Sequence, residues 1–279
     1  MNRRTLLLTA LAMLAFAGNS LLCRLALKDT EIDPATFTAL RIVSGALTLW
    51  LLLRLRPGSG AVSGSWFGAL SLFVYAAAFS FAYLNLDAGA GALLLFGAVQ
   101  ISMLLWGFYR GERLGLPGSA GLLMAFAGLL VLLLPGASAP SLSAALLMLL
   151  SGAAWGAYSL LGRGVTDPLA ATAGNFLRAI PFALVTSAVL LGSLGWDGPG
   201  LVYALLSGAL TSGAGYAIWY TALRGLKAFQ AATVQLSVPI ITALAGSLLL
   251  SEPLTLRLII SSVAVLGGIA LVLGSRQRS

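Results

Sequence analysis

Ten apolar segments, each long enough to cross a lipid bilayer as an α-helix, follow one another along this chain of 279 residues. A membrane-spanning helix needs about 20 predominantly apolar residues. Only 9% of the residues are charged, whereas soluble domains carry about 25%. The sequence therefore predicts an all-α polytopic membrane protein whose short loops hold no soluble domain. The expected spans lie near residues 5–27, 34–53, 65–85, 88–108, 116–135, 141–162, 169–192, 200–223, 228–250 and 255–274.

Lysine and arginine residues are distributed unevenly between the two sides of these spans. With the N-terminus in the cytoplasm, eleven of them fall on the cytoplasmic side and three, Arg24, Lys28 and Arg257, fall on the other. Cytoplasmic loops of membrane proteins carry such an excess of positive charge. We therefore expect a bacterial-type inner (plasma) membrane protein with both termini in the cytoplasm. The net charge of +8 then reflects topology and not the binding of nucleic acid.

The first span also resembles a secretory signal peptide, because Arg3 and Arg4 precede a leucine-rich run. This run continues to Leu27, which is too long for the apolar region of a signal peptide, and a matching segment recurs in the middle of the chain. We therefore expect a first membrane span here and not a cleaved signal.

The two halves of the chain resemble each other. The string SLLCR at 20–24 matches SLLGR at 159–163, and an Asp-Pro pair opens both the second and the seventh span. Because five spans is an odd number, the second copy enters the membrane in the opposite orientation. The sequence thus predicts two inverted five-helix repeats, at residues 1–138 and 139–279. Many secondary transporters have this architecture and bind their substrate at the repeat interface, although a channel can share the symmetry.

Two equivalent helical faces carry aromatic side chains at helical spacing. Tyr75 and Phe79 share a face of the third span, and Tyr216 and Trp219 lie on the matching face of the eighth. Such rings can line a mostly apolar binding pocket, or they can form a belt at the membrane interface. The sequence-based candidates for substrate binding are Asn19, Tyr75, Phe79, Gln100, Trp155, Tyr158, Tyr216, Trp219 and Gln235.

Three amides among these candidates are polar groups inside expected spans. Asn19 needs hydrogen-bond partners in hydrocarbon, and it can find them on a neighbouring helix or in a cavity. Gln100 and Gln235 make the fourth and ninth spans polar. We expect these amides to fix the amino or carboxylate group of a substrate in a cavity lined by spans one, three, four, six, eight and nine.

Four charged residues are expected to be structural. Arg41 and Arg178 lie inside their spans, where they can attract an anionic substrate group, reach the interface by snorkelling, or bind carbonyls of a neighbouring helix end. We favour the last two roles. Glu112 and Glu252 precede the fifth and tenth spans, where a carboxylate can meet the positive end of a helix dipole or pair with arginine.

The chain contains no histidine and a single cysteine, Cys23. With the acids confined to loops and span ends, we expect no metal site, no cofactor and no dedicated proton-coupling site in mid-membrane. An integral-membrane enzyme would need a cluster of catalytic side chains, so we do not expect an enzyme. The expected partners are a small-molecule substrate and membrane lipid.

These residues also carry a family resemblance. The chain resembles drug/metabolite transporters of the EamA type, which consist of two five-helix halves. The matching marks are Arg41 and Arg178 early in their spans, and Gly-Glu-x-Leu or Ser-Glu-x-Leu after the fourth and ninth spans. Pro239 in the ninth span also fits the pattern, whereas Val99 stands at the equivalent position of the first half.

Among members of the family, the chain looks most like the YddG group of aromatic amino-acid exporters. The resemblance implies a secondary transporter that exports small metabolites, chiefly amino acids with an aromatic preference, by alternating access. The alternatives are an exporter of another metabolite or drug, and a channel.

The topology can be tested with reporter fusions. A reporter at Arg278 is expected to lie in the cytoplasm, and one at Ser138 outside, because the charge bias and the even number of spans require both termini inside. Activity of paired alkaline phosphatase and green fluorescent protein fusions measures this. Finding both sites on one side of the membrane would rule out the inverted-repeat arrangement.

Overall fold

The computed structural model describes residues 3–56, 61–111, 113–136, 139–163, 165–226 and 228–275. Within this part of the chain the regular secondary structure is all helical, and ten helices are long and apolar enough to cross a membrane. The predicted all-α fold with ten spans is therefore confirmed. The helices are α1 (Arg3–Asp29), α2 (Pro34–Leu55), α3 (Trp66–Tyr83), α4 (Ala88–Tyr109), α5 (Leu116–Leu133), α6 (Leu142–Leu161), α7 (Pro168–Val189), α8 (Gly198–Leu206), η2 (Ser207–Ala214), α9 (Gly215–Leu223), α10 (Ala228–Gln235), α11 (Ser237–Leu250) and α12 (Leu256–Ser275), with a short 3-10 turn η1 (Leu191–Ser193).

Two of the spans are irregular. The eighth consists of α8, the π-helix η2 and α9, which together run over Gly198–Leu223. The ninth is divided between α10 and α11, and Pro239 lies in the first turn of α11, where its missing N–H leaves no hydrogen bond unmade. By contrast, α7 continues through Pro181.

The two Asp-Pro pairs cap the helices that they open. Asp33 Oδ1 accepts hydrogen bonds from the N–H groups of Ala35 (2.8 Å) and Thr36 (3.1 Å), and Asp167 Oδ1 accepts one from Ala170 (3.2 Å). A carboxylate in this position satisfies backbone donors that have no partner inside the helix, and proline is well suited to the first helical position.

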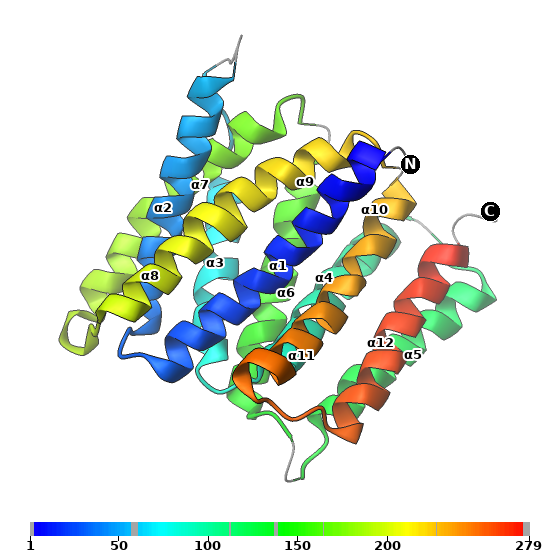
Figure 1. Cartoon of the computed structure of the whole chain (residues 1–279). Helices are drawn as coiled ribbons and strands as arrows, with labels where there is room; N and C mark the ends of the chain where they lie inside the picture. The colour runs from blue at the N-terminus through cyan, green and yellow to red at the C-terminus, as the bar shows by residue number, and fades with distance from the viewer. Residues whose placement is uncertain are drawn as a thin grey trace.

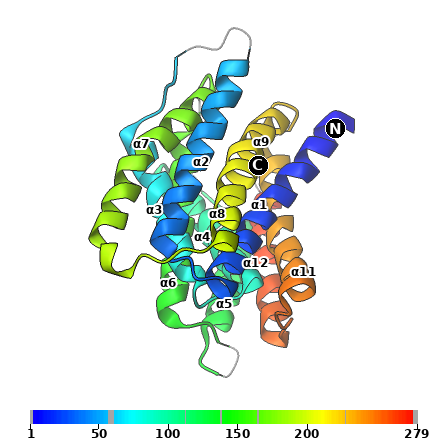
Figure 2. The same cartoon turned by 60° about the vertical axis from the view of Figure 1, so that its left-hand side comes forward.

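Helices from the two halves pack against each other throughout the bundle. α3 and α4 pack on α6, and α9 and α11 pack on α1. These contacts exchange under the predicted pseudo-two-fold and are therefore consistent with an inverted repeat. Figures 1 and 2 both show α1 between α9 and α11, with α2 beside α7 at one edge of the bundle. Both termini lie at one end of the bundle in Figure 1, which we call the terminus end, and we call the other the opposite end.

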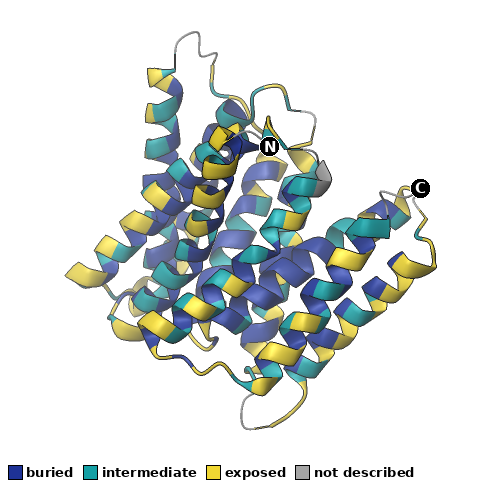
Figure 3. Ribbon diagram, turned by 45° about the vertical axis from the view of Figure 1, so that its right-hand side comes forward, coloured by how far each residue is buried: buried dark blue, intermediate teal, exposed yellow. Residues whose placement is uncertain are grey.

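The outer surface of the bundle is apolar. Leu116, Leu123, Leu248 and Val263 are between 70% and 88% exposed, and Figure 3 shows such exposed residues along the outward faces of the helices. A soluble monomer does not expose an apolar surface of this extent. The lipid bilayer is the solvent that this surface fits.

Helices α5 and α12 make the most extensive contact between two helices in the bundle and approach through small residues. Gly121 of α5 faces Gly268 of α12, and a Cβ atom on Gly121 would lie 2.5 Å from the carbonyl oxygen of Gly268. Helices in membranes gain stability by van der Waals contact where small residues let their backbones meet. The glycines here permit that contact.

Replacing Gly121 by alanine should lower the thermal unfolding midpoint of the purified protein in detergent. The added methyl group must separate the two helices, and overpacking of this kind costs about 1–3 kcal/mol. Gly267→Ala is the matched control, because its Cβ would meet only the flexible Met124 side chain at 3.3 Å. Equal midpoints for the two variants would contradict close packing at Gly121.

Candidate functional site

A small cavity lies at the centre of the bundle, between the two halves. Its volume is about 20 Å³, which is space for about one water molecule. We call this cavity the central chamber. Helices α1, α3, α4, α6, η2 and α9 supply its lining residues, which are Phe16, Asn19, Ser20, Tyr75, Phe79, Leu95, Phe96, Trp155, Thr211 and Tyr216.

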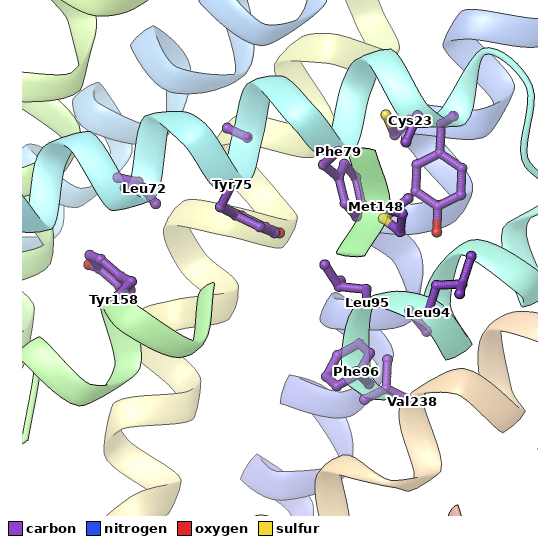
Figure 4. Packing of buried hydrophobic residues seen from close by; sticks show 14 of the residues in the cluster. Cys23, Leu72, Tyr75, Phe79, Leu94, Leu95, Phe96, Met148, Tyr158 and Val238 are labelled. Atoms are coloured by element: carbon purple, nitrogen blue, oxygen red, sulfur yellow. The ribbon is translucent and has the colours of Figure 1, made fainter. Parts of the chain in front are cut away.

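Aromatic rings from both halves form most of the chamber wall. The ring centroids of Tyr75 and Trp155 are 4.8 Å apart, those of Trp155 and Tyr216 are 5.2 Å apart, and Phe16 meets Tyr216 edge to face at 6.0 Å. Figure 4 shows Tyr75 and Phe79 projecting from α3 toward the side of α4 that carries Leu95 and Phe96. The sequence alternative of an interfacial belt does not describe these rings, because Tyr75, Phe79 and Tyr216 are at most 5% exposed.

A hydrogen-bond network crosses the chamber at Asn19. The Asn19 Nδ2 donates to the Tyr75 hydroxyl (3.3 Å), and its Oδ1 accepts from the hydroxyls of Ser207 (2.8 Å) and Thr211 (3.2 Å). Asn19 therefore does both things that the sequence left open: it bonds across helices, and it lines the chamber. The network links α1 to α3 of its own half and to η2 of the other half.

The π-helix η2 brings the polar residues of the eighth span to this point. A Cβ atom on Gly208 would lie 2.8 Å from the Cα of Arg41, so α2 and η2 approach through backbone contact. π-Helical turns are rare and are frequently found at functional sites. Sequence periodicity treats the span as a regular α-helix, and for this reason it did not identify Ser207 or Thr211 as site residues.

Arg41 is 2% exposed and points into the protein. Its Nη2 donates to the Tyr75 hydroxyl (2.8 Å) and its Nε to the Ser212 hydroxyl (3.4 Å). The guanidinium carbon also lies 5.0 Å from the ring centroid of Tyr75 and 4.9 Å from that of Phe79. The expectation that Arg41 snorkels or binds helix-end carbonyls is therefore wrong, because α2 turns the side chain toward the chamber wall.

Arg178, its counterpart in the predicted repeat, has different partners. Arg178 donates through Nη1 to the carbonyl oxygens of Ser63 (2.7 Å) and Gly174 (3.1 Å). Ser63 belongs to the segment that leads into α3, so Arg178 binds backbone carbonyls at the terminus end, as the sequence analysis expected.

The remaining sequence candidates lie outside the chamber wall. Trp219 does not line the chamber, but its ring meets that of Phe16, which does, edge to face with 5.8 Å between centroids. Gln100 is buried on α4, and Gln235 donates to the Ala231 carbonyl of its own helix. Among the described residues, neither glutamine lines the chamber, and the ninth span contributes no residue to its wall. Helical spacing places a residue on a face but does not say which neighbour covers that face.

A larger cavity, of about 450 Å³, opens at the terminus end. We call it the vestibule. Tyr158 forms part of its lining with Thr172, Asn175 and Tyr220. The Tyr158 ring stacks on Trp155, which faces the central chamber, with 5.2 Å between centroids. These two stacked rings stand between the vestibule and the chamber.

At the opposite end, charged residues tie three segments together. Arg24 donates through Nε to Glu252 (3.1 Å), through Nη2 to Asp87 (3.4 Å), and through Nη1 to the Tyr83 carbonyl (2.9 Å). We call Arg24, Asp87 and Glu252 the opposite-end cluster. It joins the end of α1 to the α3–α4 turn and to the segment before α12.

Glu252 caps a different helix from the one expected. Its Oε2 accepts from the backbone N–H of Ala88 (2.7 Å) at the start of α4, not from α12. Burial raises the pKa of the Glu252 carboxyl above its ordinary value, and the bonds from Ala88 and Arg24 oppose this. The carboxyl therefore takes up a proton at a higher pH than an exposed glutamate does. Its sequence counterpart Glu112 lies outside the described residues.

An ion pair joins the two halves at the terminus end. Arg56, after α2, donates to both carboxylate oxygens of Asp167, with 3.1 Å between Nη1 and Oδ1. The bond from Arg56 lowers the pKa of the Asp167 carboxyl below its ordinary value, so this pair stays ionised at neutral pH. The equivalent Asp33 instead accepts from the Gly195 N–H (3.0 Å) of the other half.

The ten helices that are long and apolar enough to span a membrane place this chain among integral membrane proteins. Residues 142–274 match the model of the EamA-like transporter family. The second half of the chain thus matches this family, which is part of the drug/metabolite transporter superfamily, and relatives named as transporters extend the similarity to the first half.

Similar proteins extend over the whole chain. An uncharacterized protein of Pseudomonas aeruginosa is 66% identical over 99% of this chain and 96% of its own length. An uncharacterized transporter of Archaeoglobus fulgidus is 27% identical over 100% of both chains, and one of Bacillus subtilis is 22% identical over 86% and 87%. A solved crystal structure of a protein has a TM-score of 0.70 and 19% identity over 100% of both chains, which shows the same fold.

The opposite-end cluster can be tested through Cys23, the fully buried neighbour of Arg24. Glu252→Gln keeps an acceptor for Ala88 but removes the charge that holds Arg24. We expect reaction of Cys23 with N-ethylmaleimide to become about 5-fold faster or more, because about 1 kcal/mol changes a population by this factor.

The control is Asp167→Asn, which breaks the ion pair at the terminus end and should not speed the labelling of Cys23. Mass spectrometry of the purified protein measures the labelled fraction with time. Labelling of Glu252→Gln at the wild-type rate would show that the cluster does not close this end.

Proposed function

We propose that this protein is a secondary transporter that exports small metabolites, amino acids with an aromatic preference, by alternating access. The observation that carries the proposal is the central chamber, to which the two halves contribute facing walls. Phe16, Tyr75 and Phe79 come from the first half, and Trp155 and Tyr216 from the second. A site shared in this way changes its exposure when one repeat rocks against the other.

The chemistry of the wall supports an aromatic solute. Ligand sites are mostly apolar and contain a few polar groups that fix orientation. Here aromatic rings surround a few polar side chains, among which Asn19, Ser20 and Thr211 offer amide and hydroxyl groups. Each ring that stacks on a substrate adds about 0.5–1.5 kcal/mol beyond burial of its area. Gln100 and Gln235 have no part in the proposed site, because neither lines the chamber.

Two barriers flank the chamber and support alternating access over a continuous pore. The stacked Trp155 and Tyr158 separate it from the vestibule, and the opposite-end cluster ties the helices beyond it. A space of about 20 Å³ holds no amino acid, so a substrate must displace side chains or helices to enter. With both termini in the cytoplasm of a bacterial-type cell, the vestibule faces the cytoplasm and receives solute for export.

The proposal is tested by counterflow of radiolabelled L-tryptophan into proteoliposomes loaded with the unlabelled amino acid. Tyr216→Ala should lower the rate about 5-fold or more, since the lost contact is worth about 1 kcal/mol. L-alanine should compete poorly with the labelled solute. Saturable counterflow also separates a carrier from a channel, which does not show it.

Tyr109→Ala is the matched control, because this tyrosine is 81% exposed on α4 and should transport as the wild type does. Melting curves in detergent report the amount of folded protein for each variant. A Tyr216→Ala variant that folds and transports normally would make this ring a packing residue. A wild-type protein that shows no counterflow of any aromatic amino acid would rule out the proposed substrate class.

A further inference from the structure

Arg41 is a buried cation whose described partners are all neutral. It is 2% exposed within α2, and its hydrogen bonds go to the hydroxyls of Tyr75 and Ser212. A charged side chain inside a membrane is costly and is normally paired with an opposite charge or with carbonyl groups. Each acid that the structure describes lies in a loop or at a helix end. None of the ion pairs formed by the described residues includes Arg41.

The guanidinium also has unused hydrogen-bonding capacity. It carries five N–H donors, and within the described part of the chain Nη1 has no acceptor. A buried donor without a partner loses its solvation and gains nothing in return. The two ring faces of Tyr75 and Phe79 offset part of the cost of the charge, at 5.0 and 4.9 Å, but a ring face does not replace a hydrogen-bond acceptor in the plane of the guanidinium.

The comparison with Arg178 indicates that the fold does not require this arrangement. The two arginines occupy equivalent positions in the repeat, and Arg178 is satisfied by the carbonyls of Ser63 and Gly174. If the arginine served only to hold helices together, the same solution would be open to Arg41. The first half instead directs its cation toward the chamber wall.

Arg41 lies directly behind that wall. Tyr75 and Phe79, the two rings that it contacts, both line the chamber, and the Tyr75 hydroxyl bonds Arg41 and Asn19 together. An anionic group that enters beside Asn19 meets the guanidinium once the Tyr75 hydroxyl yields its place. A carboxylate fits this position best, because its two oxygens match the fork of Nη1 and Nη2.

We propose that Arg41 recognises the carboxylate of the transported solute and thereby makes the carrier selective for carboxylates over their neutral amides. This inference rests on the proposed function of the central chamber. The carboxylate accepts from Nη1 and Nη2, while the aromatic part of the solute lies against Trp155 and Tyr216. The charge of the site is then balanced only when substrate is bound.

The experiment compares L-phenylalanine with L-phenylalaninamide as competitors of labelled L-phenylalanine counterflow by the full-length protein in proteoliposomes. In the wild type the acid should compete about 10-fold better or more, as expected for hydrogen bonds to a charged group. In Arg41→Met this ratio should fall to within about 2-fold, because the charge and the fork are lost. Arg41→Lys should fold more readily and show an intermediate ratio, since it keeps the charge without the fork.

Arg178→Met is the matched control and should keep the wild-type ratio. Thermal stabilisation of the detergent-purified protein by each compound gives the same comparison without transport. An unchanged ratio in Arg41→Met or, where that variant does not fold, in Arg41→Lys overturns the inference and makes Arg41 structural. A wild type that carries both compounds equally overturns it too, while the proposed transport stands. Failure of the proposed function itself appears separately, as absence of counterflow for every aromatic compound.

Discussion

The high cost of an unpaired charge or backbone group in hydrocarbon governs the arrangement of this structure. Several ionised groups are placed where they satisfy helix ends. Asp33 and Asp167 cap the helices that follow them and also hold a segment from the other half. Glu252 caps α4 and binds Arg24. The same few carboxylates thus cap the N-terminal ends of helices and also join the two halves. They lie at the two ends of the bundle, where water and headgroups lie.

Arg41 is the exception that gives this pattern a functional meaning. The predicted repeat pairs Arg41 with Arg178, and the fold satisfies Arg178 with carbonyls while it leaves Arg41 behind an aromatic wall with an Nη1 that has no acceptor among the described residues. A symmetric scaffold can supply stability to both halves, but a binding site for an asymmetric solute requires the halves to differ. The π-helix of the eighth span adds to this difference, because it places Ser207 and Thr211 against Asn19.

The size of the chamber connects packing to function. Its rings fill the space between the halves so that about 20 Å³ remains, while the vestibule holds about 450 Å³. Aromatic contacts that stabilise the empty protein are the same contacts that a bound solute would have to replace. An exchange of ring–ring contacts for ring–solute contacts would suit the carrier that we propose, which must both bind and release its solute.

The sequence by itself indicated that the protein lies in a membrane, how many spans it has, and that Asp-Pro pairs open two of its helices. Runs of about 20 apolar residues require a bilayer, and Asp-Pro pairs act locally on the next helix. It also placed Asn19, Tyr75 and Tyr216 in the interior, where they line the chamber, because the rings recur at helical spacing and an amide in hydrocarbon needs partners. Only the tertiary structure decided which helix Glu252 caps, that Gln100 and Gln235 lie away from the chamber, and that Arg41 faces inward. These outcomes depend on which surfaces of the two halves meet, and helical periodicity carries no information about the partner across an interface.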